Sequence, residues 1–167
     1  LDLLGCLLLM PIVVPLMAIC AVLVLLEDGR PILFKQMRTG KGGRCFAMWK
    51  FRTMVTNEEE LKEKYAHLNE LTLPDFKIAN DPRITSCGRW LRNTSLDELP
   101  QLFNVLRGEM SFVGPRPTSF SSDSYDLRHT ERLEVTPGIT GLWQVSGRSD
   151  VDFDERHGLD VAYIEAQ

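Results

Sequence analysis

The 167-residue sequence predicts a mostly helical α+β fold, in which a membrane-embedded N-terminal segment precedes one small domain. Three observations support this prediction. Residues 3–26 carry no charged side chain, residues 32–54 partly alternate apolar and polar side chains around a glycine-rich turn, and residues 97–107 repeat apolar side chains at helical spacing. An uncharged run of 24 residues is longer than the roughly 18 to 20 expected of a membrane helix. We therefore divide the chain into a membrane segment, 1–29, and a domain, 30–167.

Two prolines, Pro11 and Pro15, interrupt the apolar run. Each removes an amide donor and crowds the carbonyl group four residues earlier, so the helix should bend or break near its middle. At about 1.5 Å per residue the run reaches roughly 36 Å, enough to cross a bilayer. Two halves that meet at a break could instead enter one leaflet and return. The residues alone leave both topologies open.

Charge is distributed unevenly around this segment. The chain has a net charge of −4, yet residues 27–54 hold seven basic and two acidic side chains. Basic flanks stay on the cytoplasmic side of a membrane, next to anionic headgroups. A cleaved signal peptide is not predicted, because Asp2 stands where a basic region belongs and Glu27 follows the run directly. We expect a membrane protein whose domain lies on the cytoplasmic face.

Other site classes are not supported by the sequence. The four cysteines form no CxxC pair and the three histidines no HxxH or HExxH spacing, so reduced thiols and no zinc site are expected. The stretch TGKGG at 39–43 lacks the spacing of a phosphate-binding loop and is read as a hairpin tip. No nucleic-acid partner is expected. Because residue 1 is not methionine, we expect a piece of a longer protein.

Three further helices are predicted in the domain. Residues 57–71 combine an acidic first turn with i,i+4 ion pairs, which indicates a solvated helix. A short helix is expected around Cys87–Arg92 and another over Phe153–Gln167. Residues 114–117 and 136–149 are rich in turn formers and are predicted to be mostly loop.

The stretch TSLDELPQL, residues 94–102, places two adjacent carboxylates, Asp97 and Glu98, before a proline. A capping box from Ser95 to Glu98 is the structural alternative. That start would leave Pro100 as the fifth helical residue, whereas a helix that starts at Asp97 places Pro100 in the first turn, where amide donors are unpaired anyway. On this helix Asp97, Gln101 and Asn104 would share an open face opposite the apolar stripe, so neither carboxylate is expected to face the core. The positive helix end favours ionised carboxylates and bound phosphate.

Arginines surround this pair in the sequence. Arg89 and Arg92 precede it, and Arg116 lies between Pro115 and Pro117, which stiffen its backbone. Guanidinium groups suit phosphate oxygens. Together with the membrane segment, these residues indicate phosphoryl transfer to or from a lipid, with Mg²⁺ neutralising a diphosphate substrate.

Four blocks of the sequence resemble the bacterial sugar transferase family of monotopic polyprenyl-phosphate phosphoglycosyltransferases. They are KFRTM (50–54), NDPRIT (80–85), RNTSLDELPQLFNVLRGEMSFVGPRP (92–117) and TPGITGLWQVSGR (136–148). The resemblance implies transfer of hexose 1-phosphate from a UDP-sugar to undecaprenyl phosphate with release of UMP, at the start of capsule, exopolysaccharide or O-antigen synthesis. It also implies that the protein belongs to the bacterial inner membrane, with its active site on the cytoplasmic face.

The resemblance also implies roles for individual residues. Asp97 would be the nucleophile that forms a covalent phospho-sugar intermediate, and Glu98 its partner toward Mg²⁺ or the acceptor, so both are candidate metal ligands. Lys50, Arg92 and Arg116 would bind phosphates.

In the family the membrane segment is a re-entrant helix-break-helix, broken at a Ser-Pro pair. Here Pro15 takes the proline position and Val14 replaces the serine. A membrane-tethered module that binds anionic lipid or nucleotide without catalysis, and a spanning anchor on an unrelated soluble enzyme, are the alternatives. The identity of the sugar and the oligomeric state, a homodimer included, stay open.

Overall fold

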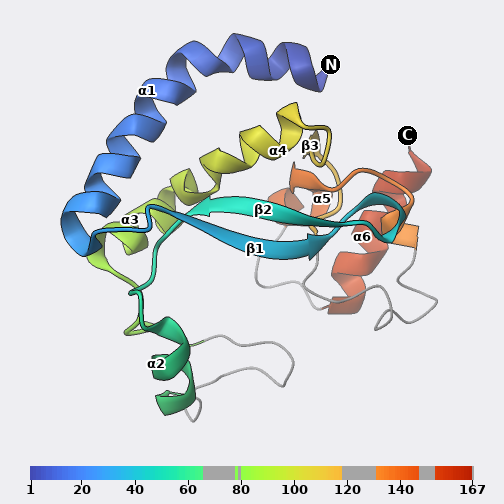
Figure 1. Cartoon of the computed structure of the whole chain (residues 1–167). Helices are drawn as coiled ribbons and strands as arrows, with labels where there is room; N and C mark the ends of the chain where they lie inside the picture. The colour runs from blue at the N-terminus through green and yellow to red at the C-terminus, as the bar shows by residue number, and fades with distance from the viewer. Residues whose placement is uncertain (66–77, 79, 118–130, 147–152, 167) are drawn as a thin grey trace.

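The computed structural model describes residues 1–65, 78, 80–117, 131–146 and 153–166 (Figure 1). Its elements confirm a mostly helical chain with short sheets. Four stretches of the described residues are strands, and η marks a 3₁₀ helix. In chain order they are α1 (Asp2–Asp28), β1 (Leu33–Thr39), η1 (Lys41–Gly43), β2 (Cys45–Phe51), α2 (Glu58–Lys64), α3 (Ser86–Thr94), η3 (Leu96–Gln101), α4 (Leu102–Leu106), β3 (Ser111–Val113), β4 (Gly138–Thr140), α5 (Leu142–Ser146) and α6 (Phe153–Glu165).

The N-terminal helix α1 is continuous over 27 residues, with Pro11 and Pro15 inside it. Figure 1 shows its axis bending between the two halves. The expected break at Pro15 is therefore wrong in its stronger form, since no residue between Asp2 and Asp28 leaves the helix. Proline removes a single helical hydrogen bond and displaces the chain locally, which is enough to bend a long helix without interrupting it.

Only a narrow stripe of α1 packs on the domain. Its buried residues are Cys6, Val13, Cys20 and Val24, and a spacing of seven keeps side chains on one helical face. The other faces expose large apolar side chains such as Leu8 (70%) and Leu26 (78%). Its apolar stretch is long enough to cross a membrane. An exposed apolar surface of this size is a membrane or partner surface, which supports the predicted membrane association.

The C-terminal end of α1 is attached to the domain by polar contacts. The Glu27 carboxylate accepts hydrogen bonds of 2.8 Å from the Ser86 and Cys87 amides, the free donors at the start of α3. Arg52 donates to the carbonyl oxygens of Asp28 and Gly29 at 2.7 and 3.0 Å. These contacts fix the direction in which α1 leaves the domain.

The predicted hairpin is confirmed. Strands β1 and β2 pair antiparallel from Leu33 opposite Phe51 to Thr39 opposite Cys45, and η1 forms the tip. Lys35 lies over the ring of Trp49, its cross-strand partner, at 4.3 Å from the ring centre. On β2, Phe46 and Met48 enter the core that also contains Leu102 and Val105 of α4.

The helix predicted from Asp97 differs from the structure. Its first part is the 3₁₀ helix η3, and only α4 is α-helical. No side-chain cap from Ser95 forms, so the capping box is also wrong. The polar residues expected on the open face, Gln101 and Asn104, are 1% and 0% exposed. The reason is tertiary: η3 and α4 lie between α1 and the hairpin, so both of their sides are covered (Figure 1).

The short strands β3 and β4 pair in parallel. Strand β4 and helix α5 lie within residues 136–149, a range predicted to be mostly loop, and the sequence predicts no strand at β3. Three-residue strands that pair across a long sequence separation leave no local pattern to detect. Gly138 is required at their crossing, since a Cβ there would lie 2.2 Å from the Gly114 nitrogen. The GPRP segment that follows β3 is loop, as predicted.

The remaining helices agree with their predictions where they are described. Helix α3 contains the predicted Cys87–Arg92, with Thr85 as its cap. Helix α2 covers the first part of the predicted 57–71, and residues 66–71 lie outside the described residues. Helix α6 starts at the predicted Phe153, while Gln167 and residues 147–149 are likewise outside them.

Candidate active site

An abrupt turn between α3 and η3 brings the acidic pair next to Arg92. Ser95 adopts a left-handed conformation with φ of 59°, and its amide bonds back to the carbonyl oxygens of Leu91 and Arg92. This ends α3 and starts η3 at the next residue. Asp97 and Glu98 therefore follow within one turn of the end of α3, where Arg92 lies.

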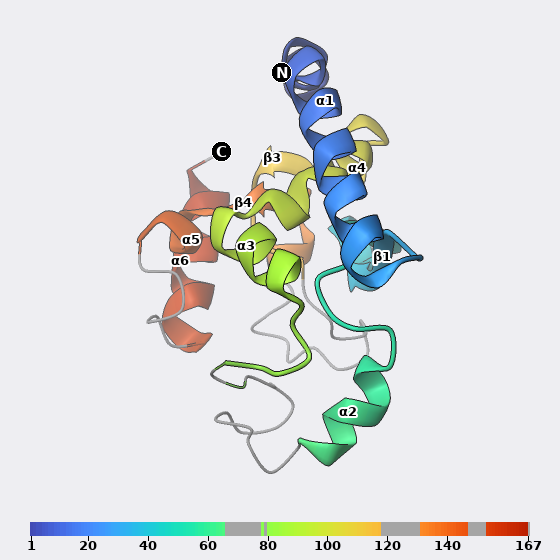
Figure 2. The same ribbon diagram turned by 90° about the vertical axis from the view of Figure 1, so that its left-hand side faces the viewer.

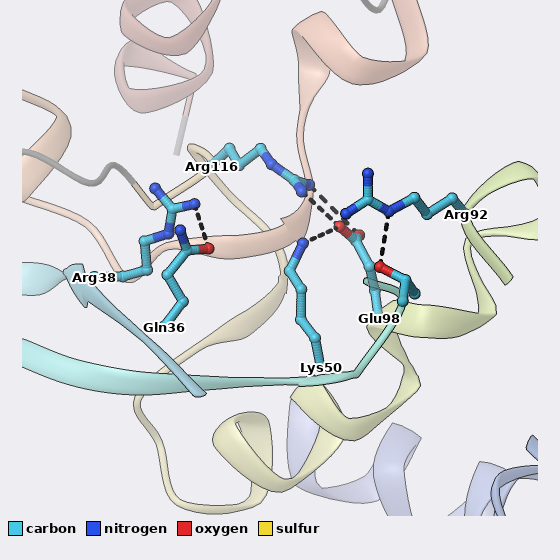
Figure 3. Close-up of polar contacts among 7 residues, drawn as sticks. Gln36, Arg38, Lys50, Arg92, Glu98 and Arg116 are labelled. Atoms are coloured by element: carbon cyan, nitrogen blue, oxygen red, sulfur yellow. Dashed lines mark hydrogen bonds and ion pairs between the residues drawn. The ribbon is translucent and has the colours of Figure 1, made fainter. Parts of the chain in front are cut away.

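Glu98 is the centre of a compact ionic cluster. Its Oε1 accepts from Lys50 Nζ at 2.9 Å and from an Arg116 guanidinium nitrogen at 2.5 Å, and its Oε2 lies 3.5 Å from the other guanidinium nitrogen. Figure 3 shows the Lys50, Arg92 and Arg116 side chains converging around Glu98 from three elements. Burial alone would raise the pKa of Glu98, but the hydrogen bonds and charges of Arg116 and Lys50 lower it to about 2.

Asp97 lies beside this cluster with its carboxylate uncommitted. The residue is 8% exposed, and its side chain makes no hydrogen bond or ion pair within the described part of the chain. Burial raises the pKa of Asp97, and the negative charge of Glu98 raises it further. The positive charges of Lys50, Arg92 and Arg116 lower the pKa, but the net shift is upward. Adjacent carboxylates thus have opposite pKa shifts, which is a feature of functional sites.

Two supports fix the cations around the pair. Thr53 Oγ1 accepts a hydrogen bond from Arg92 Nε at 2.8 Å. Helix α3 can approach Thr53 closely because residue 88 is glycine, since a Cβ there would lie 2.1 Å from the Thr53 carbonyl oxygen. On the other side, the Asn104 side chain accepts from the Trp49 amide at 3.2 Å and donates to Ala47 O at 2.8 Å. Asn104 therefore fixes strand β2, which carries Lys50.

Burial also affects Lys50. Desolvation lowers its pKa, the Glu98 charge raises it and the Arg116 charge lowers it again. A positive charge held in a poorly solvated place interacts strongly with any anion that enters. The site can therefore neutralise added phosphate charge at Lys50, Arg92 and Arg116 while Asp97 remains free to react.

The structure brings together five of the six residues singled out from the sequence. Lys50, Glu98 and Arg116 are in direct contact. Asp97 interacts electrostatically with all three, and Arg92 interacts with Asp97. Pro15 is separate, inside α1. Sequence reasoning missed Thr53, Asn104 and the residues that hold the Arg116 segment, because a side chain that orients another leaves no local motif. The expectation that neither carboxylate faces inward is wrong for Asp97, which is buried where η3 packs against β2.

Comparison with known proteins gives the family. The sequence profile described as "Bacterial sugar transferase" matches residues 1–167. The chain belongs to the bacterial sugar transferase family. The resemblance seen in the sequence is thereby confirmed over the whole chain.

Named relatives of this family member share much of its sequence. It is 50% identical over 144 residues to the undecaprenyl-phosphate galactose phosphotransferase of Salmonella typhimurium, covering 83% of this chain and 30% of that protein. It is 43% identical over 169 residues to the UDP-galactose-lipid carrier transferase of Erwinia amylovora (98% and 35%) and 39% identical over 181 residues to the undecaprenyl-phosphate glucose phosphotransferase of Komagataeibacter xylinus (99% and 31%). The chain therefore spans about a third of the length of these relatives.

The acidic pair of this sugar transferase is where the sequence predicts Mg²⁺. No group of three or more His, Cys, Asp or Glu side chains clusters within the described residues, which argues against a cage built by protein alone there. Mg²⁺ commonly takes one or two carboxylates and completes its shell with water and substrate phosphates. The uncommitted Asp97 carboxylate, with Glu98 next to it, suits that pattern.

Proposed function

We propose that the chain transfers hexose 1-phosphate from a UDP-sugar to undecaprenyl phosphate and releases UMP, through a covalent intermediate on Asp97. The observation that carries this proposal is the contrast within the acidic pair. Glu98 is neutralised by Lys50 and Arg116, whereas the Asp97 carboxylate has no hydrogen bond or ion pair among the described residues and interacts with the same cations through its charge. The family and the names of the relatives support the reaction class.

In the first displacement, an Asp97 oxygen attacks the phosphorus that bears the sugar. The bond from that phosphorus to the oxygen bridging the two phosphates breaks, and UMP leaves with the bridging oxygen and its electron pair. The sugar phosphate remains on Asp97 as an acyl phosphate. Arg116, Arg92 and Lys50 bind the phosphate oxygens and stabilise the charge that develops there.

In the second displacement, a phosphate oxygen of undecaprenyl phosphate attacks the same phosphorus. The bond to Asp97 breaks, its carboxylate is regenerated, and the lipid diphosphate sugar is the product. Because one carboxylate serves both halves, donor and acceptor react in turn and ping-pong kinetics are expected.

Asp97 and Glu98 would hold Mg²⁺ in this proposal. The ion supplies neutralisation of the diphosphate, whose negative charge would otherwise repel an attacking carboxylate. The chain's own cations contribute to the same neutralisation. Their places on β2, on α3 and after β3 keep them on different sides of Glu98 (Figure 3).

Incubation with donor alone tests the covalent step. The protein, exposed to a panel of UDP-sugars without acceptor, is expected to gain the mass of one hexose phosphate on the peptide that contains Asp97, and to release UMP in one burst. Added undecaprenyl phosphate should discharge the adduct. A non-catalytic binding module would show no adduct and no dependence on Mg²⁺, and an adduct elsewhere would contradict the assignment of Asp97.

We further propose that α1 is re-entrant and that the site lies at the cytoplasmic membrane surface. Pro11 and Pro15 bend α1 where a returning segment must turn, and its outer faces expose only apolar side chains in the middle. The basic residues of the hairpin follow it directly. A lipid-linked acceptor presents its phosphate at headgroup depth, so a site there can meet both substrates.

Cysteine labelling tests this topology. In a background with Cys45 and Cys87 replaced by serine, Asp2→Cys and Arg30→Cys variants are treated with a membrane-impermeant maleimide, in intact spheroplasts and in inverted vesicles. Both positions are expected to react only in inverted vesicles. Reaction of the two positions from opposite sides would establish a spanning helix instead.

A further inference from the structure

The backbone that carries Arg116 is fixed by main-chain contacts before the side chain is considered. Arg116 follows Val113, the end of β3, by three residues. The Gly114 amide donates to Thr140 O at 2.9 Å, and the Gly138 amide donates to Pro115 O at 3.0 Å. Strand β4 thus holds the two residues directly before Arg116.

Helix α6 holds the same segment at two more points. Tyr163 Oη donates to the carbonyl oxygen of Val113 at 3.0 Å. Asp160, one turn earlier on the same face, lies with Oδ2 2.8 Å from a guanidinium nitrogen of Arg132, and that nitrogen donates to Arg116 O at 3.1 Å. The four residues from Val113 to Arg116 are thereby held at both ends by one helix. Figure 2 shows α6 beside α5, on the side of the domain away from α1.

Burying the Arg132–Asp160 ion pair costs desolvation free energy, and this cost is explained if the pair positions the backbone of Arg116. The Asp160 and Arg132 side chains are 1% and 10% exposed. A buried ion pair loses much of its attraction to desolvation and is weak evidence for stability. The pair does orient the Arg132 guanidinium group, because one of its nitrogens lies close to both the Asp160 carboxylate and the Arg116 carbonyl oxygen. That carbonyl belongs to the residue whose side chain binds Glu98.

We propose that α6 is a positioning element for the active site: through Tyr163 and the Arg132–Asp160 pair it fixes the Val113–Arg116 segment and so sets the Arg116 guanidinium group against Glu98. The inference deepens the proposed function and rests on it for the role of Arg116 in transfer. Arg132 meets Arg116 at its carbonyl oxygen and Asp160 holds Arg132, so both are assigned to act through Arg116.

The test is a double-mutant cycle between Asp160 and Arg116 in the full-length protein in lipid nanodiscs. Asp160→Asn keeps the size of the side chain and is expected to lower kcat/KM by about 10- to 100-fold, as a misplaced binding group does. In an Arg116→Ala background the same change should add less than about twofold, because the group that it positions is gone. The exposed Glu165→Gln on the same helix is the matched control, with unchanged activity expected.

A second measurement separates positioning from general destabilisation and from failure of the proposed function. The Arg116 Nε–Hε signal in ¹H–¹⁵N NMR spectra, assigned by its loss in Arg116→Ala, reports the surroundings of the guanidinium group that binds Glu98, without any turnover. The signal is expected to shift or broaden in Asp160→Asn and to stay in place in Glu165→Gln, while the Tm of Asp160→Asn shows whether the fold persists. Fully additive losses of activity, or an unchanged Arg116 signal, would overturn the positioning role. If the parent protein transfers no sugar but the Arg116 signal still responds to Asp160→Asn, the positioning holds and the proposed function fails.

Discussion

Replacing Asp97 with asparagine is expected to abolish transfer, with a loss of at least about a thousandfold in kcat. Asparagine has the shape of aspartate, but its amide is not a nucleophile and cannot form the acyl phosphate. The measurement is UMP release with saturating UDP-sugar and undecaprenyl phosphate, with the exposed Glu131→Gln as a control that should retain full activity. Near-normal turnover by Asp97→Asn would refute the assignment of the nucleophile.

The same substitution should not weaken the fold. Burial raises the pKa of Asp97, more than the Lys50, Arg92 and Arg116 charges lower it. A carboxyl group with a raised pKa supports the folded state below its unfolded pKa, and this contribution is lost as pH rises through the folded pKa. At neutral pH the Asp97 charge therefore opposes folding, and Asp97→Asn should keep or raise Tm. A clear fall in Tm at pH 7 would show that Asp97 supports the fold as well.

The chemistry of the site could be read from the sequence to a large extent, because its residues lie in dense local blocks. Three blocks show directly which charge they bring to the site: the adjacent carboxylates, the arginine between two prolines and the basic stretch around Lys50. Which of these charged side chains contact one another could not be predicted from the sequence. Nothing local indicates that Lys50 and Arg116 both reach Glu98 and leave Asp97 uncommitted, since that follows from how β2 and the Val113–Arg116 segment cross η3.

The fold was predictable where one segment determines its own structure. The apolar run, the hairpin and α6 follow from composition and periodicity, and the structure has each of them. Prediction failed where long-range contacts decide. Asn104 was expected on an open face, but it is buried because it pairs with the edge of β2. Strands β3 and β4 exist because Gly114 and Gly138 let two backbones approach closely.

Replacing Glu98 with glutamine should reduce transfer by at least about a hundredfold, the loss typical of removing one preorganised electrostatic group. Glutamine keeps the shape but leaves Lys50 and Arg116 facing each other without the anion that orders them. If Glu98 also holds Mg²⁺, the concentration of Mg²⁺ that gives half-maximal activity should rise. Initial rates over a Mg²⁺ titration measure both effects, again with Glu131→Gln as the control.

The effect on stability should have the sign opposite to that of Asp97→Asn. The pKa of Glu98 falls from 4.5 to about 2 on folding, so its ionised form supports the fold above the unfolded pKa, and the support is lost as pH falls from about 4.5 toward 2. At neutral pH the contribution is on the order of 3 kcal/mol. Glu98→Gln is thus expected to lower Tm at pH 7, and the difference from the parent protein should shrink as the pH is lowered through this window. If both substitutions shifted Tm in the same direction at pH 7, the division into one neutralised and one uncommitted carboxylate would be wrong.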